Sequence, residues 1–202
     1  VMSRNCVLPP ETRFLLSYNA IVVLAMLGLP AELKEMLVAS CSVTESTKRH
    51  IEKDAKRLVS EQFEGGTGRL GYDDGLVMFE YDDGTKGQAK DVCTLLLDFT
   101  ESVKSIKPSL KLVDRDAAVL LADNEMIDIR TASDNGFVYV TEDVLEAQIV
   151  DLFALCNRSS VSGLLVAIGR LDYVLNAFSE KLKEWDAQPV LEVDLRQAVA
   201  SA

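Results

Sequence analysis

Short apolar segments alternate with longer helical patterns along most of this 202-residue chain. The clearest short segment is 137–141, a run of aromatic and β-branched residues that predicts a buried, parallel strand. Two more strands are expected at 12–18 and 38–43, and a short one at 110–113. Strands that alternate with helices through short turns form a mostly parallel sheet. The pattern therefore predicts an α/β fold with a central, mostly parallel sheet.

Helical patterns fill most of the chain between these strands. The expected helices span residues 20–28, 31–37, 44–61, 89–106, 116–135, 143–156, 162–171 and 173–185. The helix over 116–135 is expected to end at Asn135-Gly136, because this pair is typical of a helix C-terminal cap.

Residues 64–87 differ in character from the rest of the chain. Glycines cluster there, and two strand-like pieces, 69–72 and 76–81, flank Asp73-Asp74-Gly75. An Asp-Gly pair between such pieces predicts a β-hairpin, here inserted between two helices. The G-x-G-x-x-G pattern at 66–71 follows a helix and opens the hairpin, so it lacks the strand-to-helix context of a dinucleotide site.

The charge and the cysteines limit the class of protein. The formal net charge is −11, which disfavours a basic groove for DNA. The longest apolar runs are too short to cross a bilayer, and the start of the chain has no signal-peptide pattern. The four cysteines are widely spaced, as expected for reduced thiols in a cytoplasmic protein without a membrane association.

His50 is the single histidine. Zinc sites built on two or three histidines are therefore excluded within one chain. Any bound metal is expected to be a hard cation held by carboxylates. In a parallel sheet the site lies beyond the carboxyl ends of the strands. The residues to inspect there are Asn19, the turn at 43–45 and the turn at 141–143.

One segment has a more specific pattern. Glu125 stands in a helix, Ala132 on the buried face of that helix, and Gly136 at the turn; an apolar strand and then Thr141-x-Asp143 follow. This order resembles the C-terminal half of PIN-domain nucleases, which have a helix Asp, a small residue, a Gly turn, an apolar strand and Thr/Ser-x-Asp. Glu125 then stands where the family usually has its helix Asp.

The N-terminal half is similar to the same family. Asn19 follows the first strand, where the family has an Asp, and an apolar helix comes next. The second strand leads into a helix in which His50 stands at the family's Glu, with Glu45 nearer the cap. The run 157–165 resembles a Val-Ser-Thr-x-x-Leu-Leu ending of some PIN-like domains.

The resemblance spans residues 12–170 apart from the hairpin. It implies a PIN-like three-layer fold over residues 1–170, with 64–87 as an inserted hairpin and 171–202 as a C-terminal helical extension.

The resemblance also implies an activity, the hydrolysis of RNA phosphodiesters by bound Mg²⁺ or Mn²⁺. Asp143, Glu125 and Asn19 would be metal ligands, and His50 would complete the catalytic set. Asn19 would supply a neutral carbonyl oxygen, and histidine is a poor ligand for Mg²⁺. Two acids and two substitutions imply weak metal binding, unless Asp128 or Glu142 compensates. The partner would be single-stranded RNA. The aromatic residues of the hairpin would either stack on the RNA bases or pair within the hairpin and pack on the domain.

In a second hypothesis, the chain has the PIN-like fold but no catalytic activity. The chain would then be a regulatory or protein-interaction module of a larger bacterial protein, with a protein partner or a second copy bound, for example, through the helix around 178–185. The opening Val1-Met2-Ser3-Arg4 fits a piece of a longer chain. A third hypothesis is an unrelated α/β adaptor.

Each site residue also has an ordinary structural explanation. Asn19 and Asp143 are suitable helix caps, Glu125 a solvated helix acid, and His50 an exposed residue on a polar helix.

Overall fold

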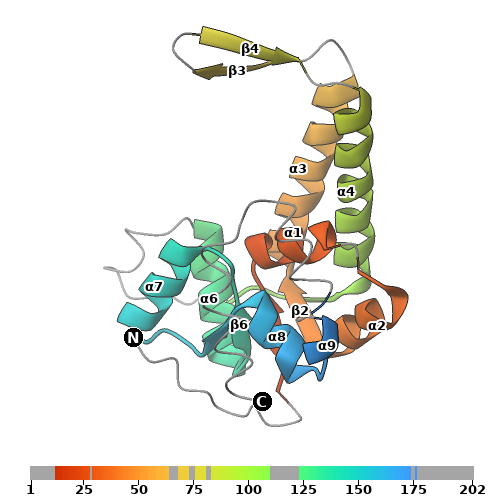
Figure 1. The fold of residues 1–202 in the computed structure, drawn as a ribbon. Coiled ribbons are helices and arrows are strands. Elements are labelled where there is room, and N and C mark those ends of the chain that lie inside the picture. Colours follow the sequence, from red (N-terminus) through yellow and green to blue (C-terminus); the bar gives the residue numbers. More distant parts are fainter. Residues whose placement is uncertain are drawn as a thin grey trace.

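The computed structural model describes residues 12–27, 29–63, 68–72, 76–80, 83–109, 123–173 and 176; for 58–63, 68–72, 76–80, 83–90, 92, 123 and 171 it describes the backbone alone. Its centre is a parallel sheet of strand order β5-β2-β1-β6-β7 (Figure 1). The strands are β1 (Phe14–Leu16), β2 (Cys41–Thr44), β5 (Lys104–Ile106), β6 (Val138–Val140) and β7 (Arg158–Ser159). Each neighbouring pair is parallel, which confirms the expected α/β fold.

Helices connect the strands. They are α1 (Tyr18–Met26), α2 (Ala31–Ser40), α3 (Glu45–Phe63), α4 (Asp83–Ser102), α6 (Asp123–Asn135), α7 (Val144–Leu152), α8 (Val161–Ala167) and α9 (Leu171–Tyr173). Gly136 has a φ of +67° and follows α6 directly, so the expected cap at Asn135-Gly136 is confirmed.

Side chains of the central strands alternate between two faces of the sheet. In β1, Phe14 and Leu16 belong to one core cluster and Leu15 to another. The parallel register sets Leu15 beside Tyr139 of β6, whose ring lies in the same cluster as Leu15. Since successive strand residues point to opposite faces, the sheet is buried on both sides.

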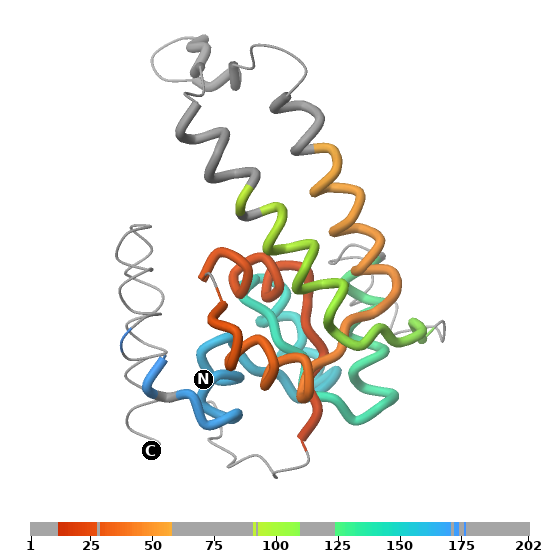
Figure 2. The backbone as a smooth tube through the Cα atoms, turned by 90° about the vertical axis from the view of Figure 1, so that its right-hand side faces the viewer, coloured from red at the N-terminus to blue at the C-terminus, as the bar shows by residue number. Residues whose placement is uncertain are grey.

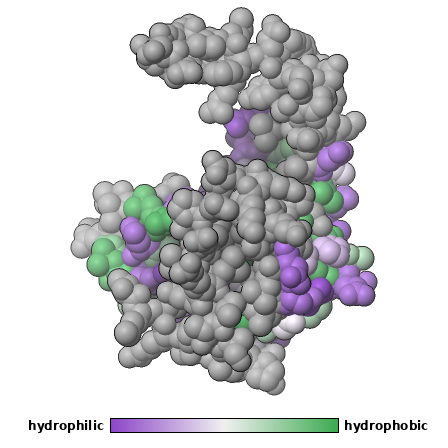
Figure 3. All heavy atoms as spheres, in the orientation of Figure 1, coloured by the Kyte–Doolittle hydropathy of each residue, from purple (hydrophilic) through white to green (hydrophobic). Residues whose placement is uncertain are grey.

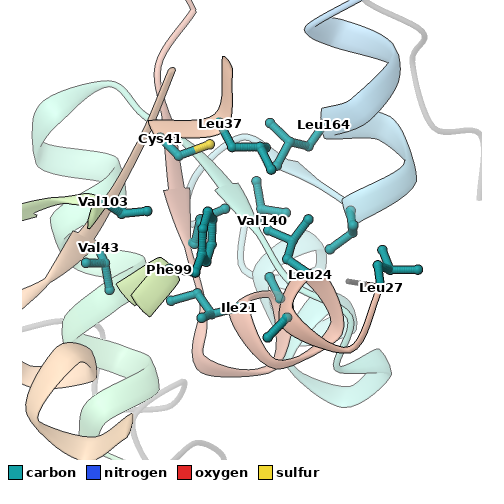
Figure 4. Close-up of a cluster of buried hydrophobic side chains, with 14 of the residues drawn as sticks. Ile21, Leu24, Leu27, Leu37, Cys41, Val43, Phe99, Val103, Val140 and Leu164 are labelled. Carbon is teal, nitrogen blue, oxygen red and sulfur yellow. The ribbon is translucent and has the colours of Figure 1, made fainter. Parts of the chain in front are cut away.

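The larger core lies between the sheet and helices α1, α2, α4 and α8. Phe99 of α4 is 2% exposed and packs among apolar side chains from the sheet and from α1 (Figure 4). Helices α6 and α7 supply Ile129, Ala132 and Val150 to the cluster on the other face. The sheet is thus the middle of three layers.

Helices α3 and α4 pack side by side and form an arm that extends away from the sheet (Figures 1 and 2). At the far end of the arm, β3 (Gly68–Tyr72) and β4 (Leu76–Glu80) pair antiparallel. The hairpin expected between two helices is therefore confirmed.

Several element boundaries differ from the sequence prediction. β1 ends at Leu16, because Ser17 already caps α1 with its hydroxyl, so Asn19 lies inside the helix. Helix α4 ends at Ser102, and residues 104–106 pair with β2 as a strand. The expected strand at 110–113, the start of the helix expected over 116–135 and the part of the C-terminal helix at 177–185 lie outside the described residues. Among the described helices, none is both long and apolar enough to cross a membrane.

Candidate functional site at the carboxyl edge of the sheet

The carboxyl ends of the parallel strands share one edge of the sheet, here called the carboxyl edge. The chain leaves β1 toward β2 on one side and leaves β6 toward β7 on the other. The space between the ends of β1 and β6 is therefore the topological switch point, where ligands bind in open parallel sheets. Asn19 and Asp143 follow these two strands.

The structure brings Asn19 and Asp143 together. The Asn19 amide Nδ2 donates to Oδ2 of Asp143 at 3.5 Å, although 124 positions separate the two residues in sequence. Both side chains are half-buried. The distance is at the long end for a hydrogen bond, so this contact is weak. The two residues therefore lie at one edge of the sheet, although Asn19 stands in α1 and not at the end of a strand.

Asp143 also caps a helix. Its Oδ1 accepts from the backbone N of Glu146 at 2.9 Å, and its own N–H donates to the Thr141 hydroxyl at 3.1 Å. These two bonds close the turn between β6 and α7. Both carboxylate oxygens of Asp143 are therefore engaged by donors of this chain.

Asp128 of α6 lies deeper at the same edge. It is 2% exposed, and its two oxygens accept from Thr44, the last residue of β2, and from Thr47, in the first turn of α3. Thr44 donates to Oδ1 at 2.5 Å, and Thr47 donates to Oδ2. Burial raises the pKa of Asp128 to about 7, although the two hydroxyl donors lower it and the charges of Glu146 and Glu125 raise it further. Asp128 is thus a buried acid held by two hydroxyl groups, neither of which carries a positive charge.

Glu146 of α7 is a second buried acid, also 2% exposed. Tyr139 donates its phenolic O–H to Oε1 at 2.5 Å, and Thr141 donates to Oε2. Burial raises the pKa of Glu146; its hydroxyl partners lower it, and Glu125 and Asp143 raise it. Glu146 therefore ties α7 back to β6.

Glu125 is half-buried in the first turns of α6. Its charge helps to raise the pKa of both Asp128 and Glu146, so it belongs to the same acidic region. Glu142, the other expected compensator, accepts at Oε1 from the backbone N of Val161, at the start of α8. That contact draws the Glu142 carboxylate toward α8.

His50 lies at the rim, on α3. Its Nε2 is 3.1 Å from Asp54 Oδ2, and its Nδ1 is 3.1 Å from the amide nitrogen of Asn124. The ring also contacts Tyr18, with the ring centres 5.1 Å apart. Both ring nitrogens thus have partners, and none of these partners is Asn19, Glu125 or Asp143. The expected grouping of His50 with these three residues is not seen in its contacts.

The acids do not form a cation cage among the described side chains. Within that part of the chain, no group of three or more His, Cys, Asp or Glu residues is arranged to hold a metal ion. The donor set available for Mg²⁺ or Mn²⁺ would be the Asp143 carboxylate and the Asn19 amide oxygen, both oxygen ligands that suit such ions. In the structure, however, the amide nitrogen faces Asp143. The residues present fit a hard cation only in part.

The sequence prediction missed Glu146 as a site residue and treated Asp128 only as a compensator. Asp128 and Glu146 each interrupt the apolar stripe of a helix, and this pattern can be seen in the sequence. Asp128 precedes Ile129 and lies four positions before Ala132, while Glu146 lies three and four positions before Ile149 and Val150. An acid on the buried stripe of an amphipathic helix needs an internal partner, so such positions mark buried polar contacts.

No family model and no curated protein matches this sequence. A solved structure described as the crystal structure of PAE2754 from Pyrobaculum aerophilum is similar in fold, with a TM-score of 0.46 and 15% sequence identity. The match covers 79% of this chain and 96% of that one.

Proposed function

We propose that this chain is a catalytically degenerate PIN-like module that serves as a regulatory or protein-interaction domain of a larger bacterial protein. One observation carries the proposal. Asp128, Asp143 and Glu146 each have both carboxylate oxygens engaged by donors of this chain. These acids hold α3, α6, α7 and the strands in place.

Carboxylates whose oxygens already accept hydrogen bonds are poor ligands for a metal ion. A cation at Asp128 or Glu146 would have to displace two hydroxyl donors in a nearly inaccessible position. Hydrogen bonds to a charged group contribute about 1.5–3 kcal/mol each, so the displacement is costly. Asp143 is more accessible, but a cation there would compete with the cap of α7 and with the Asn19 amide.

The surface beside Asp143 fits a binding role. Val144, Leu145 and Leu152 of α7 are 56%, 61% and 76% exposed. Figure 3 shows an apolar patch, coloured green, at the left of the molecule, where Figure 1 has α7. Leu145 and Leu152 are seven positions apart and so share one side of the helix. Exposed apolar side chains that gather on one element are typical of contact surfaces.

The proposal is tested by metal binding and RNA cleavage together. Isothermal titration with MnCl₂ and MgCl₂ would accompany cleavage assays on a labelled single-stranded RNA, with Asp143→Asn and Glu125→Gln as matched variants. We expect no metal-dependent cleavage and no binding heat that the variants remove. Mn²⁺-dependent cleavage that disappears in both variants would overturn the proposal.

The second candidate function is a metal-dependent ribonuclease. It is favoured by the Asn19–Asp143 contact at the switch point, the position where a ligand is expected in a parallel sheet. A flip of the Asn19 amide would turn its oxygen toward the carboxylate, and a cation between the two oxygens would stabilise that arrangement. The residues that would hold Mg²⁺ or Mn²⁺ are then Asn19 and Asp143, with Glu125 nearby.

The variant Asn19→Asp separates the two candidates. A carboxylate at position 19 would face Asp143 at the distance now spanned by the amide, 3.5 Å. If the region is a weakened metal site, the variant binds Mn²⁺ at least tenfold more tightly than the wild type and Mn²⁺ raises its melting temperature. If the acids are structural, the variant loses about 1 kcal/mol by like-charge repulsion and Mn²⁺ restores none of it.

A further inference from the structure

The outer side of α7 is apolar, whereas the outer side of a surface helix is usually polar. Among the described residues, the three most exposed large apolar side chains, Val144, Leu145 and Leu152, all belong to this helix. At about 100° per residue, Leu145 and Leu152 differ by about 20° around the helix axis, and Gln148 lies between Leu152 and Val144. We call these four residues the α7 face. Apolar side chains gathered in this way are typical of a surface that contacts another molecule.

The opposite side of the helix holds the α7 face in place. Ile149 and Val150 are buried and belong to the clusters that pack α7 on α6 and on the sheet. Near the end of the helix, Arg158 donates to both carboxylate oxygens of Asp151, at 2.8 and 2.5 Å. A partner therefore meets a preformed surface, and binding costs little conformational entropy on this side of the contact.

The helix that carries this face is acidic. Residues 142–152 include four acids and no lysine or arginine. Glu146 is buried, while Glu142 and Asp143 stand just before the first residue of α7 and Asp151 stands next to its last. The negative charge therefore lies at the two ends of the face, and the apolar side chains lie between them.

One acid beside the α7 face is balanced by a cation and another is not. Asp151 is paired with Arg158. Asp143 instead accepts from two neutral donors, the backbone N–H of Glu146 and the side-chain amide of Asn19, which leave its charge in place. The whole chain has a formal charge of −11, so a second copy, an RNA or an anionic membrane would bring like charge to the face. Charge complementarity therefore favours a cationic partner.

We propose that the α7 face binds a basic amphipathic helix of another protein, which sets its apolar side chains on Leu145 and Leu152 and its lysines or arginines beside Asp143. The nine residues of α7 span about 13 Å, which matches two to three turns of a partner helix. A helix suits this surface better than a strand, because the backbone groups of α7 are bonded within the helix and offer no edge for strand pairing. The inference rests on the proposed role of this chain as a protein-interaction module.

Two synthetic peptides test the chemistry of the partner. Each is labelled with fluorescein, is about 14 residues long and has leucine at i, i+3, i+4 and i+7 spacing. One peptide has lysine at the remaining positions and the other has glutamate. Fluorescence anisotropy with the full chain measures both affinities. We expect the lysine peptide to bind at least about tenfold more tightly than the glutamate peptide, and about 0.5 M NaCl to weaken its binding severalfold.

Leu145→Gln combined with Leu152→Gln tests the place of binding without a change of charge. We expect this double variant to bind the lysine peptide at least about tenfold more weakly than the wild type, because two leucine contacts are lost. Both leucines are exposed, so the variant should keep the fold, which far-ultraviolet circular dichroism checks. Met26→Gln combined with Leu95→Gln is the matched control. It replaces two exposed apolar side chains of α1 and α4 by the same amide and should leave the affinity unchanged.

The proposal is overturned if the lysine peptide does not bind, if the glutamate peptide binds as tightly, or if the two double variants weaken binding alike. It is also overturned if Leu145→Gln with Leu152→Gln removes a dimer seen in sedimentation equilibrium, or removes the binding of a labelled single-stranded RNA. A second copy or an RNA would then be the occupant of the α7 face. None of these results restores a catalytic site, so the proposal of a catalytically degenerate module is overturned separately, by Mn²⁺-dependent cleavage.

Discussion

Two aspartates at the carboxyl edge, Asp128 and Asp143, show how differently one side chain is used within one sheet. Asp128 is 2% exposed and is held by two threonine hydroxyls from a different element. Asp143 is half-buried, caps its own helix and contacts Asn19 weakly. The first joins α6 to the start of α3; the second shapes a local turn.

The difference teaches which acid constrains the fold and which is open to change. A carboxylate out of water costs several kcal/mol unless donors replace its hydration, so the partners of Asp128 matter for stability. A helix cap at a half-buried position contributes only about 1 kcal/mol. Function can be gained or lost at Asp143 with little effect on the fold, whereas the region of Asp128 is fixed by its energetics.

The largest effect is expected for Thr44→Val combined with Thr47→Val. Both replacements keep the side-chain shape and remove the donors to Asp128, which leaves a buried charge without hydrogen bonds. We expect the free energy of unfolding at pH 8 to fall by about 4 kcal/mol, measured by urea denaturation. Thr100→Val is the control, because its buried hydroxyl donates only to the Leu96 carbonyl. If both proteins lose the same amount, Asp128 has no special role.

A similar effect is expected in the pH dependence of stability. Asp128 has a pKa of about 7 in the folded chain and about 3.8 when unfolded, so between these values the folded state binds the extra proton. Stability must therefore decrease as pH rises from about 4 to about 7. In Asp128→Asn this part of the slope disappears, and the variant should exceed the wild type at pH 8 by about 4 kcal/mol. Urea titrations at several pH values measure both curves.

The opposite outcome of that experiment is informative. Glu146 also has a raised pKa and contributes a slope of the same sign in both proteins, so only the difference between the curves belongs to Asp128. Parallel curves would mean that Asp128 titrates in the folded chain as it does in the unfolded one.

The smallest effect is expected at Asp143. Asp143→Ala removes the cap of α7 and should cost about 1 kcal/mol, while Asp143→Asn, which can still accept from Glu146 N, should cost less. Thermal unfolding of the three proteins at neutral pH measures the order. A loss at Asp143 as large as that of the threonine pair would erase the contrast between the two aspartates.

The order of strands and helices was predictable from the sequence because it depends on local patterns. The strand at 137–141, the cap at Asn135-Gly136 and the hairpin between α3 and α4 all follow from residue type and spacing. The strands β5 and β7 were not predicted. These strands, Lys104–Ile106 and Arg158–Ser159, are short and mostly polar. Only pairing with a neighbouring strand holds them in an extended conformation.

The site was predictable only in part. The rule that parallel strand ends share an edge predicts that Asn19 and Asp143 lie near each other, and their side chains are 3.5 Å apart. The partners of His50 were missed because they are ordinary neighbours. Asp54 lies one helical turn away, and Asn124 reaches His50 only through the packing of α3 on α6. Which hydroxyl reaches which acid depends on tertiary geometry that no local pattern encodes.

The place of β1 in the sheet has a consequence for synthesis. β1 lies between β2 and β6, and its register pairs Phe14 with Cys41 on one side and with Val138 on the other. One partner follows within a few dozen residues, whereas the other is 124 positions away, the same separation as that of Asn19 and Asp143. At a translation rate of about 5–20 residues per second, one edge of the central strand waits roughly 6–25 s for its partner. During that interval one edge of an apolar strand is unpaired, and such an edge can pair with another chain, so the strand order itself opens a period of exposure to aggregation.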